Sequence, residues 1–133
     1  MENKKKEINV VVFSPLFGCK PQAIEDKLET YYKLIGCELI DIVKRKIGGK
    51  YFEIVCDDEA KLKAEVPPVS GHVKDSYDEF VGVLVICGEA DKESALTSLS
   101  FEDYQLIKEN VGTYLYVKDE KTAFPAAFVS MEY

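Results

Sequence analysis

The segment ELIDIVKRKIGGKYFEIVC, residues 38–56, places two glycines between two runs of β-forming residues. A two-residue hairpin turn of the primed type needs positive φ at both central positions, and glycine adopts positive φ without steric penalty. Gly48 and Gly49 therefore predict an antiparallel hairpin with strands over 38–47 and 50–56. Side chains alternate along a strand, so Phe52, Ile54 and Cys56 are expected to share one face.

Further strands are expected on both sides of this hairpin. The first covers residues 7–13, and its run of β-branched and aromatic residues predicts burial on both faces. The second is an apolar run over 81–87, which indicates a central strand. Residues 113–117 and 126–131 complete the set of predicted strands. Residues 57–65 are polar and form either one helical turn or a loop, and turn-forming residues over 67–76 then indicate an irregular connection.

Two helices are expected. Pro21 fits the first position of a helix, and the apolar residues Ile24, Leu28, Tyr31 and Ile35 recur on one helical face up to a terminating Gly36. The second helix starts at Ser100, where Asp103 three residues later nearly reproduces a capping box. Tyr104, Ile107 and Val111 would form its apolar face, and Gly112 would end it.

These elements predict an α+β fold. The chain of 133 residues matches the usual size of one domain, so residues 1–133 are expected to form a single small α+β domain. Its sheet would be mixed or mainly antiparallel with about five strands, and two helices would cover one face of it.

Composition and charge indicate the cellular compartment in which the protein is expected. The net charge is −7, divided into +3 over residues 1–50 and −10 over residues 51–133. No apolar run approaches the ~20 residues needed to cross a bilayer, and the apolar segment after the basic N-terminus is too short for a signal peptide. We therefore expect a cytoplasmic protein with no membrane contact, whose four cysteines remain reduced.

The sequence offers little for catalysis. His72 is the only histidine, it falls in a predicted loop, and neither a zinc-site spacing nor a phosphate-binding glycine motif is present. These observations predict no catalytic residues, no metal and no cofactor, and hence no enzyme. A small hydrolase that uses His72 with nearby carboxylates stays open, and it would require a pocket around that residue.

A basic cluster on the hairpin gives one candidate site. Cationic side chains beside an aromatic ring can contact phosphates and stack on bases, which is typical of nucleic-acid binding. Lysines on exposed strands also prevent edge-to-edge pairing, which is the simpler interpretation. The candidate residues are Lys44, Arg45, Lys46, Lys50 and Tyr51.

Acidic residues give a second candidate site. They occur in runs after two predicted strands, where they could form a surface for a protein partner or could simply be solvated loop residues. Lysines interrupt most of the runs. The candidate acidic partner surface consists of Asp57, Asp58, Glu59, Glu89, Asp91 and Glu93.

Several short segments resemble a family of domains of unknown function that is common in bacteria, phages and mobile elements. The resemblance covers roughly residues 34–108 and is carried by LIG at 34–36, DEAKL at 58–62, Pro67-Pro68, GVLVICG at 82–88 and SLSFED at 98–103. It implies a small accessory protein, often carried on mobile DNA, and implies no catalytic residues.

The function expected from these observations is that of a non-enzymatic binding or accessory protein that acts through a surface. A phage or mobile-element factor that blocks a host defence protein fits the size and acidity, so the expected partner is a protein. The alternative is nucleic-acid binding through the basic hairpin. A homodimer could form through an exposed edge strand or through Phe124, Phe128 and Tyr133 near the C-terminus.

Overall fold

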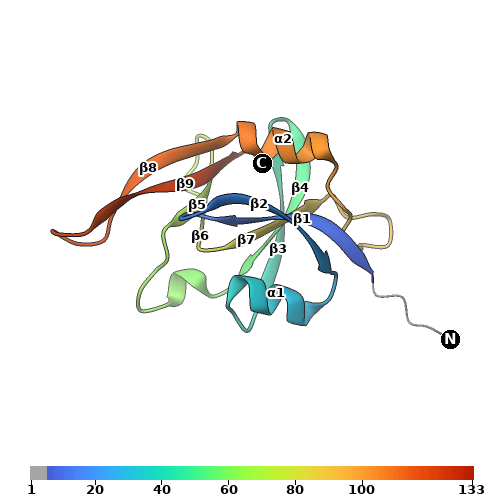
Figure 1. The fold of residues 1–133 in the computed structure, drawn as a ribbon, viewed down its shortest axis with the longest axis horizontal. Coiled ribbons are helices and arrows are strands. Elements are labelled where there is room, and N and C mark those ends of the chain that lie inside the picture. Colours follow the sequence, from blue (N-terminus) through green and yellow to red (C-terminus); the bar gives the residue numbers. More distant parts are fainter. Residues whose placement is uncertain (1–5) are drawn as a thin grey trace.

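The computed structural model describes residues 6–133 and shows two sheets packed against each other, with two α-helices (Figure 1). Sheet A has five strands in the order β2-β1-β7-β4-β3, and every neighbouring pair in it is antiparallel. Its strands are β1 (Glu7–Ser14), β2 (Gly18–Glu25), β3 (Ile40–Ile47), β4 (Lys50–Asp57) and β7 (Leu84–Gly88).

Sheet B has four strands in the order β6-β5-β9-β8. They are β5 (Val69–Val73), β6 (Glu79–Val81), β8 (Val111–Val117) and β9 (Ala123–Met131). β5 and β9 run parallel, whereas the other two pairs are antiparallel. The last strand of the chain therefore lies inside sheet B, and the predicted α+β class with a mainly antiparallel sheet is confirmed.

The predicted glycine hairpin is confirmed as β3–β4. Ile47 lies opposite Lys50, and Gly48 and Gly49 have φ values of 60° and 85°. Gly48 also lies against helix α2 (Phe101–Glu109), because a Cβ atom at this position would overlap the side chain of Leu106. Glycine is thus required here both for the turn and for the packing of α2.

Both faces of sheet A are covered. Along β4 and β7, alternate residues enter two different cores, as Ile54 and Ile86 do on one face and Val55 and Val85 on the other. Helix α1 (Leu28–Ile35) covers the second core, while α2 and sheet B cover the first (Figure 1). The expectation that both helices share one face is therefore wrong, because two-sided burial of these strands needs a cover on each side.

The helix predicted from Pro21 is also wrong in its first part. Residues 18–25 form β2, in which Pro21 lies opposite Val11 of β1, and α1 begins only at Leu28. Proline is tolerated because β2 is an edge strand. The helical spacing was misleading since Ile24 of β2 packs in the same core as Tyr31 of α1. Gly36 ends α1 with φ of 77°, as predicted.

The segment between β4 and β7 contains more structure than the sequence indicated. The helical turn left open for residues 57–65 is present as a 3₁₀ turn over Ala60–Leu62, whereas β5 and β6 replace the expected irregular connection. Gly82 has φ of 76° and separates β6 from β7, so the apolar run over 81–87 is not one strand. The capping box of Ser100 and Asp103 is confirmed.

The C-terminal hairpin forms an arm. Helix α2 ends at Glu109 with Asn110 as its C-cap, so Val111, expected on its apolar face, and Gly112, its expected terminator, already belong to β8. β8 and the first half of β9 extend beyond the body of the molecule (Figure 1), and we call residues 111–131 the arm. Within residues 6–133, no helix is both long and apolar enough to cross a membrane.

Candidate functional site

The cations of the basic hairpin are already engaged with other groups. The ammonium of Lys44 lies 3.1 Å from the Glu89 carboxylate and 3.8 Å from that of Glu53. Arg45 Nη2 donates to Asp78 at 2.8 Å, and the guanidinium lies 4.9 Å from the ring centroid of Tyr133. These contacts neutralise two of the charges that the nucleic-acid hypothesis needs.

The remaining hairpin residues do not form a common basic surface with them. Lys46 lies over the ring of Tyr51 at 5.1 Å, and Lys50 donates to the carboxylate of Asp103 on α2. Alternation along β3 puts Lys44 and Lys46 on one face and Arg45 on the other. The five candidate residues are neighbours in the hairpin, but the four cationic groups among them point in different directions.

The acidic residues of the second candidate site fall into two groups. Asp57 is the last residue of β4 and residues 58–59 follow it, whereas residues 89–93 follow β7, which runs antiparallel to β4. The two acidic groups therefore lie at opposite ends of β4. In the first group, Asp57 pairs with Lys63 at 2.9 Å.

The second acidic group organises its own loop. The Asp91 carboxylate accepts hydrogen bonds from the backbone N–H of Ala95 and of Glu93, and these two bonds lower the pKa of Asp91. Glu89 pairs with Lys44, while Glu93 is exposed. Solvation and loop geometry account for most of these carboxylates.

The four cysteines are free thiols in the structure. Burial raises the pKa of Cys56 and of Cys87 to about 12 and that of Cys19 to about 11. A thiol with such a pKa is almost fully protonated at neutral pH and is a poor nucleophile. Among residues 6–133, no group of three or more histidine, cysteine or acidic side chains is arranged to hold a metal ion.

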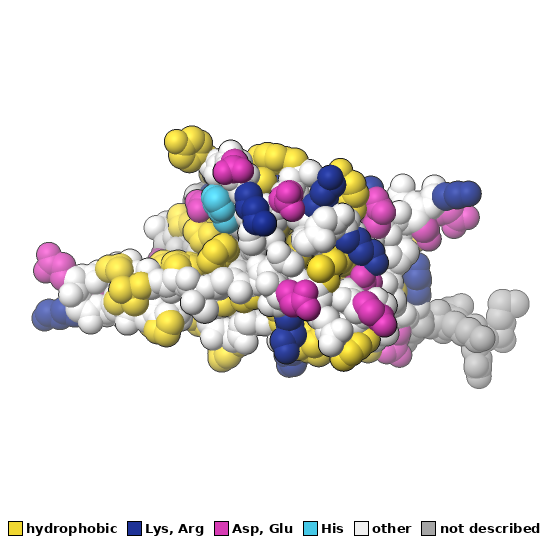
Figure 2. Space-filling model, turned by 90° about the horizontal axis from the view of Figure 1, so that it is seen from above, with side chains coloured by type: hydrophobic (Ala, Val, Ile, Leu, Met, Phe, Trp, Pro, Cys, Tyr) yellow, Lys and Arg dark blue, Asp and Glu magenta, His cyan; other side chains and the backbone are white. Residues whose placement is uncertain are grey.

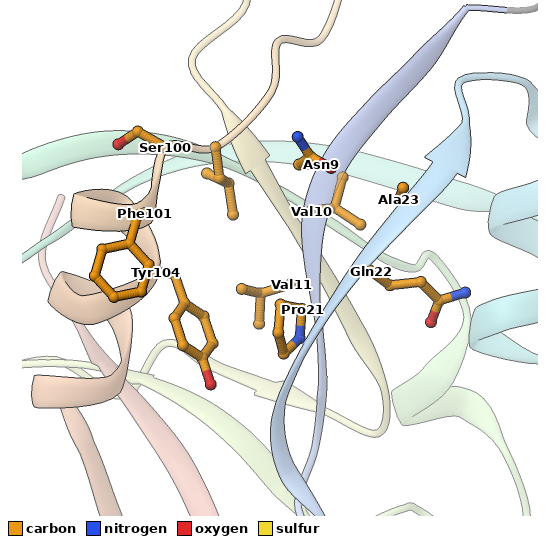
Figure 3. Close-up of a pocket in the computed structure, with 10 residues that line it drawn as sticks. Asn9, Val10, Val11, Pro21, Gln22, Ala23, Ser100, Phe101 and Tyr104 are labelled. Atoms are coloured by element: carbon orange, nitrogen blue, oxygen red, sulfur yellow. The ribbon is translucent and has the colours of Figure 1, made fainter.

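A cleft of about 400 Å³ lies between α2 and the β1–β2 edge of sheet A (Figure 3). Phe101 and Tyr104 of α2 form one wall, and the Tyr104 ring points toward Val11 and Pro21 on the strands. Its described lining contains no acidic, basic, histidine or cysteine side chain. This cleft can take an apolar group, but it offers no acid–base chemistry.

A second cleft of about 420 Å³ lies between the β3–β4 hairpin, the 3₁₀ turn and β6. Its wall includes the ion pair of Arg45 and Asp78. The other charged residues around it are Asp41, Asp57, Asp58, Lys61 and Glu79. The excess of carboxylates makes this cleft acidic, and its single guanidinium is already bonded.

The outer face of sheet B, which points away from the main core, is lined by aromatic side chains. Tyr114 and Tyr116 of β8 alternate with residues of the opposite face, and each lies near a phenylalanine of β9. The ring centroids of Tyr114 and Phe128 are 6.0 Å apart, and those of Tyr116 and Phe124 are 5.1 Å apart. We call these four residues the aromatic face.

The aromatic face borders two hollows. One, of about 220 Å³, is lined by Val69, His72, Glu79, Tyr114 and Phe128, so that all four strands of sheet B contribute to it. The other, of about 330 Å³, lies farther along the arm between the second aromatic pair and the segment Val66–Pro68. Figure 2 shows hydrophobic side chains along the arm and charged side chains at its tip.

His72 is not in an exposed loop, as the sequence suggested. It lies in β5 opposite Glu79 of β6 and is half-buried, and its Nε2 atom is 3.0 Å from the carbonyl oxygen of Ser76. The described lining of its hollow includes no serine, threonine or cysteine. The pocket required by the hydrolase alternative is present, but it offers no ordinary nucleophile beside the imidazole.

Sequence reasoning found the strands of the arm but missed the aromatic face. Tyr114 and Tyr116, two residues apart, form one available signal, since a half-exposed strand normally alternates apolar with polar residues. The sequence indicates their partners Phe124 and Phe128 only as aromatic residues near the C-terminus. Their alignment beside the tyrosines depends on the register of β8 and β9, which a single sequence does not reveal.

Comparisons with curated proteins and with solved structures gave no match. A family model described as "Domain of unknown function (DUF3846)" matches residues 8–112. The matched part contains sheet A, both helices, β5 and β6, and it ends where β8 begins. This match spans most of the chain and agrees with the resemblance drawn from the short segments above. The chain therefore belongs to the DUF3846 family of domains of unknown function.

Proposed function

We propose that the protein is a non-enzymatic binding protein that acts through the aromatic face of its arm. The observation that supports this is the side-by-side placement of four aromatic rings on a sheet face that no other element covers completely. Tyrosine and phenylalanine are enriched in protein–protein interfaces, where they bury large areas with little loss of side-chain freedom. The partner in this proposal is a protein.

The proposal includes the type of partner expected from the sequence, a host defence protein blocked by a phage or mobile-element factor. Small size and net charge of −7 support it, since an inhibitor needs only a surface. We place this activity in the cytoplasm, and the four free cysteines support a reducing compartment.

Absence of catalysis is part of the same proposal. The high thiol pKa values of Cys19, Cys56 and Cys87 and the bonded His72 imidazole argue against a nucleophile at these positions. The cleft of about 400 Å³ is lined by no acidic, basic, histidine or cysteine side chain, and the guanidinium in the cleft of about 420 Å³ is already paired with Asp78. Each of these features favours recognition over turnover.

Nucleic-acid binding by the basic hairpin is the competing proposal, and the pairing of its cations weighs against it. Lys44, Arg45 and Lys50 each contact a carboxylate, so a phosphate would have to displace an existing partner. Neutralising Lys44, Arg45 and Lys46 together should abolish a salt-sensitive gel shift if this proposal holds. Absence of any shift at low salt with the unmodified protein would refute it.

A homodimer is supported by the free edge of sheet B. Leu115 lies opposite Pro125, which has no N–H, so this pair is not hydrogen-bonded and the N–H and C=O of Leu115 point away from β9. The sequence of β8, VGTYLYV, contains neither charge nor proline, the usual means of protecting an edge. Two β8 strands could pair antiparallel about a two-fold axis.

Affinity capture from cells of the natural host tests the main proposal. The unmodified protein is compared with the double variant Tyr116→Ala/Phe124→Ala, and Glu102→Gln on exposed α2 serves as the control. We expect one protein to be captured in stoichiometric amount by the unmodified protein and the control, and to be lost with the double variant. Equal capture by all three would refute a role for the aromatic face.

A further inference from the structure

Glu79 lies in an unusual environment on the outer face of sheet B. Its neighbour Phe80 enters the main core, so alternation along β6 turns the Glu79 side chain to the opposite side, beside its cross-strand partner His72. There it lines the 220 Å³ hollow together with Tyr114 and Phe128. A carboxylate thus borders a hollow whose other walls are mainly apolar and aromatic.

Among the described residues, no cation pairs with this carboxylate. Within residues 6–133, the structure shows neither an ion pair nor a hydrogen bond to the Glu79 side chain, whereas the neighbouring Asp78 side chain is held by Arg45. The negative charge of Glu79 also acts on Tyr114, which lines the hollow. Burial is the main cause that raises the pKa of Tyr114, and the negative charge of Glu79 adds to it.

The aromatic walls also favour a positive charge. Tyr114 and Phe128 meet at an interplanar angle of 64°, and this edge-to-face arrangement orients the two rings differently around the hollow. The hydroxyl of Tyr114 donates to the Val69 carbonyl at 2.7 Å, which fixes that ring in position. Cations are attracted to the faces of such rings, most strongly where water is partly excluded.

We propose that this hollow is a binding site for an arginine side chain of the protein partner. The proposal rests on the proposed function and names the chemistry of one contact within it. The guanidinium would lie against Tyr114 and Phe128 and bond to Glu79, and its aliphatic stem would contact Val69. Arginine suits the site better than lysine because its planar group both stacks on rings and bonds a carboxylate in bidentate fashion.

The size of the hollow agrees with this occupant. At about 220 Å³ it is smaller than the roughly 300–1,000 Å³ of sites that bury a whole small molecule or cofactor. It is therefore suited to one side chain that a larger interface inserts. The adjoining hollow beside Tyr116 and Phe124 continues the same face, so flanking residues of the partner have a surface to contact.

The proposal can be tested by titrating the ¹⁵N-labelled protein with two matched peptides. Binding is measured from the chemical shifts of the backbone amides. One probe is acetyl-Gly-Arg-Gly-amide, and the other carries citrulline, which has nearly the same shape without the charge. We expect the arginine peptide to move the amide signals of β5, β6 and β8 around the hollow in a saturable way, and the citrulline peptide to bind at least fivefold more weakly. Equal binding of the two peptides, or shifts confined to other surfaces, would overturn the proposal.

Variants identify the residues responsible. Glu79→Gln keeps the shape of the side chain and should weaken the arginine peptide about tenfold, whereas Glu120→Gln at the tip of the arm removes the same charge and should leave binding unchanged. Tyr114→Phe keeps the ring and should bind nearly as well as the unmodified protein, and Phe128→Leu should bind less well. Unchanged binding by Glu79→Gln, with its spectrum otherwise intact, would contradict the assignment.

Repeating the partner capture with Glu79→Gln distinguishes failure of the arginine site from failure of the proposed function. If the partner is lost with Tyr116→Ala/Phe124→Ala but kept in full by Glu79→Gln, the aromatic face binds the partner and the arginine site is refuted. If the partner is kept by all variants, the proposed function fails, and the peptide titration alone then decides whether the hollow binds arginine.

Discussion

Sheets A and B differ in how their two faces are used. In β7 of sheet A all five residues are buried, because cores lie on both sides of the strand. In β8 of sheet B, buried residues are absent, and half-buried and exposed side chains mostly alternate. A sheet with one free face normally presents polar residues there. The arm carries apolar side chains on both faces, with half-buried tyrosine and phenylalanine on the aromatic face and the exposed Leu115 and Val117 on the other, and apolar surface of this kind is typical of a contact surface.

Truncation of a core aromatic residue in sheet A should have the largest effect on stability. Phe52 is fully buried at the centre of the main core, and Phe52→Ala should lower the free energy of unfolding by about 3–5 kcal/mol. Phe124→Ala on the aromatic face should lower it by about 1 kcal/mol, because this ring is half exposed. Urea unfolding of both variants measures the difference.

Similar losses for the two variants would show that the aromatic face is structural rather than free for a partner. If Phe52→Ala does not fold, Ile54→Ala provides the same comparison with an expected loss of about 2–5 kcal/mol.

The junction between α2 and the β3–β4 hairpin should have an intermediate effect that depends on pH. Burial alone would raise the pKa of Asp103, but hydrogen bonds from Lys50 and from Ser100 outweigh it and lower this pKa. The stabilisation is present above the unfolded-state pKa of about 3.9 and is lost as pH falls through the lower folded-state pKa. Asp103→Asn should therefore cost about 1–2 kcal/mol at pH 7 and much less at pH 2.

Urea unfolding of the unmodified protein and of Asp103→Asn at the two pH values measures this dependence. Glu102→Gln, at the exposed neighbouring position, should behave like the unmodified protein at both. An undiminished difference at pH 2 would show that the charge of Asp103 contributes nothing.

A charge placed on the free edge of sheet B should change association and leave stability almost unchanged. Leu115 is 65% exposed on β8, so Leu115→Lys should alter the free energy of unfolding by no more than about 0.5 kcal/mol. If β8 pairs with a second copy, the same variant should be a monomer in light scattering where the unmodified protein is a dimer. A monomeric unmodified protein, or a dimeric variant, would rule out pairing through this edge.

The smallest expected effect is the reaction of the buried thiols with a labelling reagent. Burial raises the pKa of Cys19, Cys56 and Cys87, so at pH 8 the thiolate fraction of each is far below that of a free cysteine. We expect these three residues to stay unlabelled by iodoacetamide in the native protein over minutes and to react fully in denaturant. Mass spectrometry of peptides identifies the labelled positions, and rapid native labelling of Cys87 would contradict the buried environment of β7.

The elements that the sequence predicted well are those specified by local chemistry. Gly48-Gly49, Gly36 and the Ser100–Asp103 capping box each define a turn or a helix end through neighbouring residues alone. The apolar strands β1 and β7 were also recognised, because continuous burial leaves a continuous apolar run.

The sequence-based predictions were wrong where contacts with distant residues determine the secondary structure. Residues 18–25 became a strand because β1 offered an edge with which to pair, and Pro21 is acceptable only at that edge. β5 is short, and its assignment depends on pairing with β9 about sixty residues later. The hollow at Glu79 combines all four strands of sheet B, so no local pattern could indicate it.

The sequence predicted only some of the candidate site residues, because the others depend on contacts between distant strands. The basic and acidic clusters were visible as runs of charge, but their pairing across strands, such as Lys44 with Glu89, follows from the register of sheet A. Tyr114 and Phe128 lie beyond the part matched by the family model, whereas His72 and Glu79 lie within it. The proposed site thus joins residues of the matched domain to residues of the arm.

The position of β9 has a consequence for biosynthesis. β9 fills the gap between β5 and β8, and Glu132 immediately after it exchanges two backbone hydrogen bonds with Lys46 of β3. A nascent chain cannot close sheet B, or cover the main core beneath it, before residues 123–132 have left the ribosome. Earlier intermediates expose the apolar side chains of β4 and β7, so we expect folding to be completed only once residues 123–132 have emerged, and chaperones to protect the chain until then.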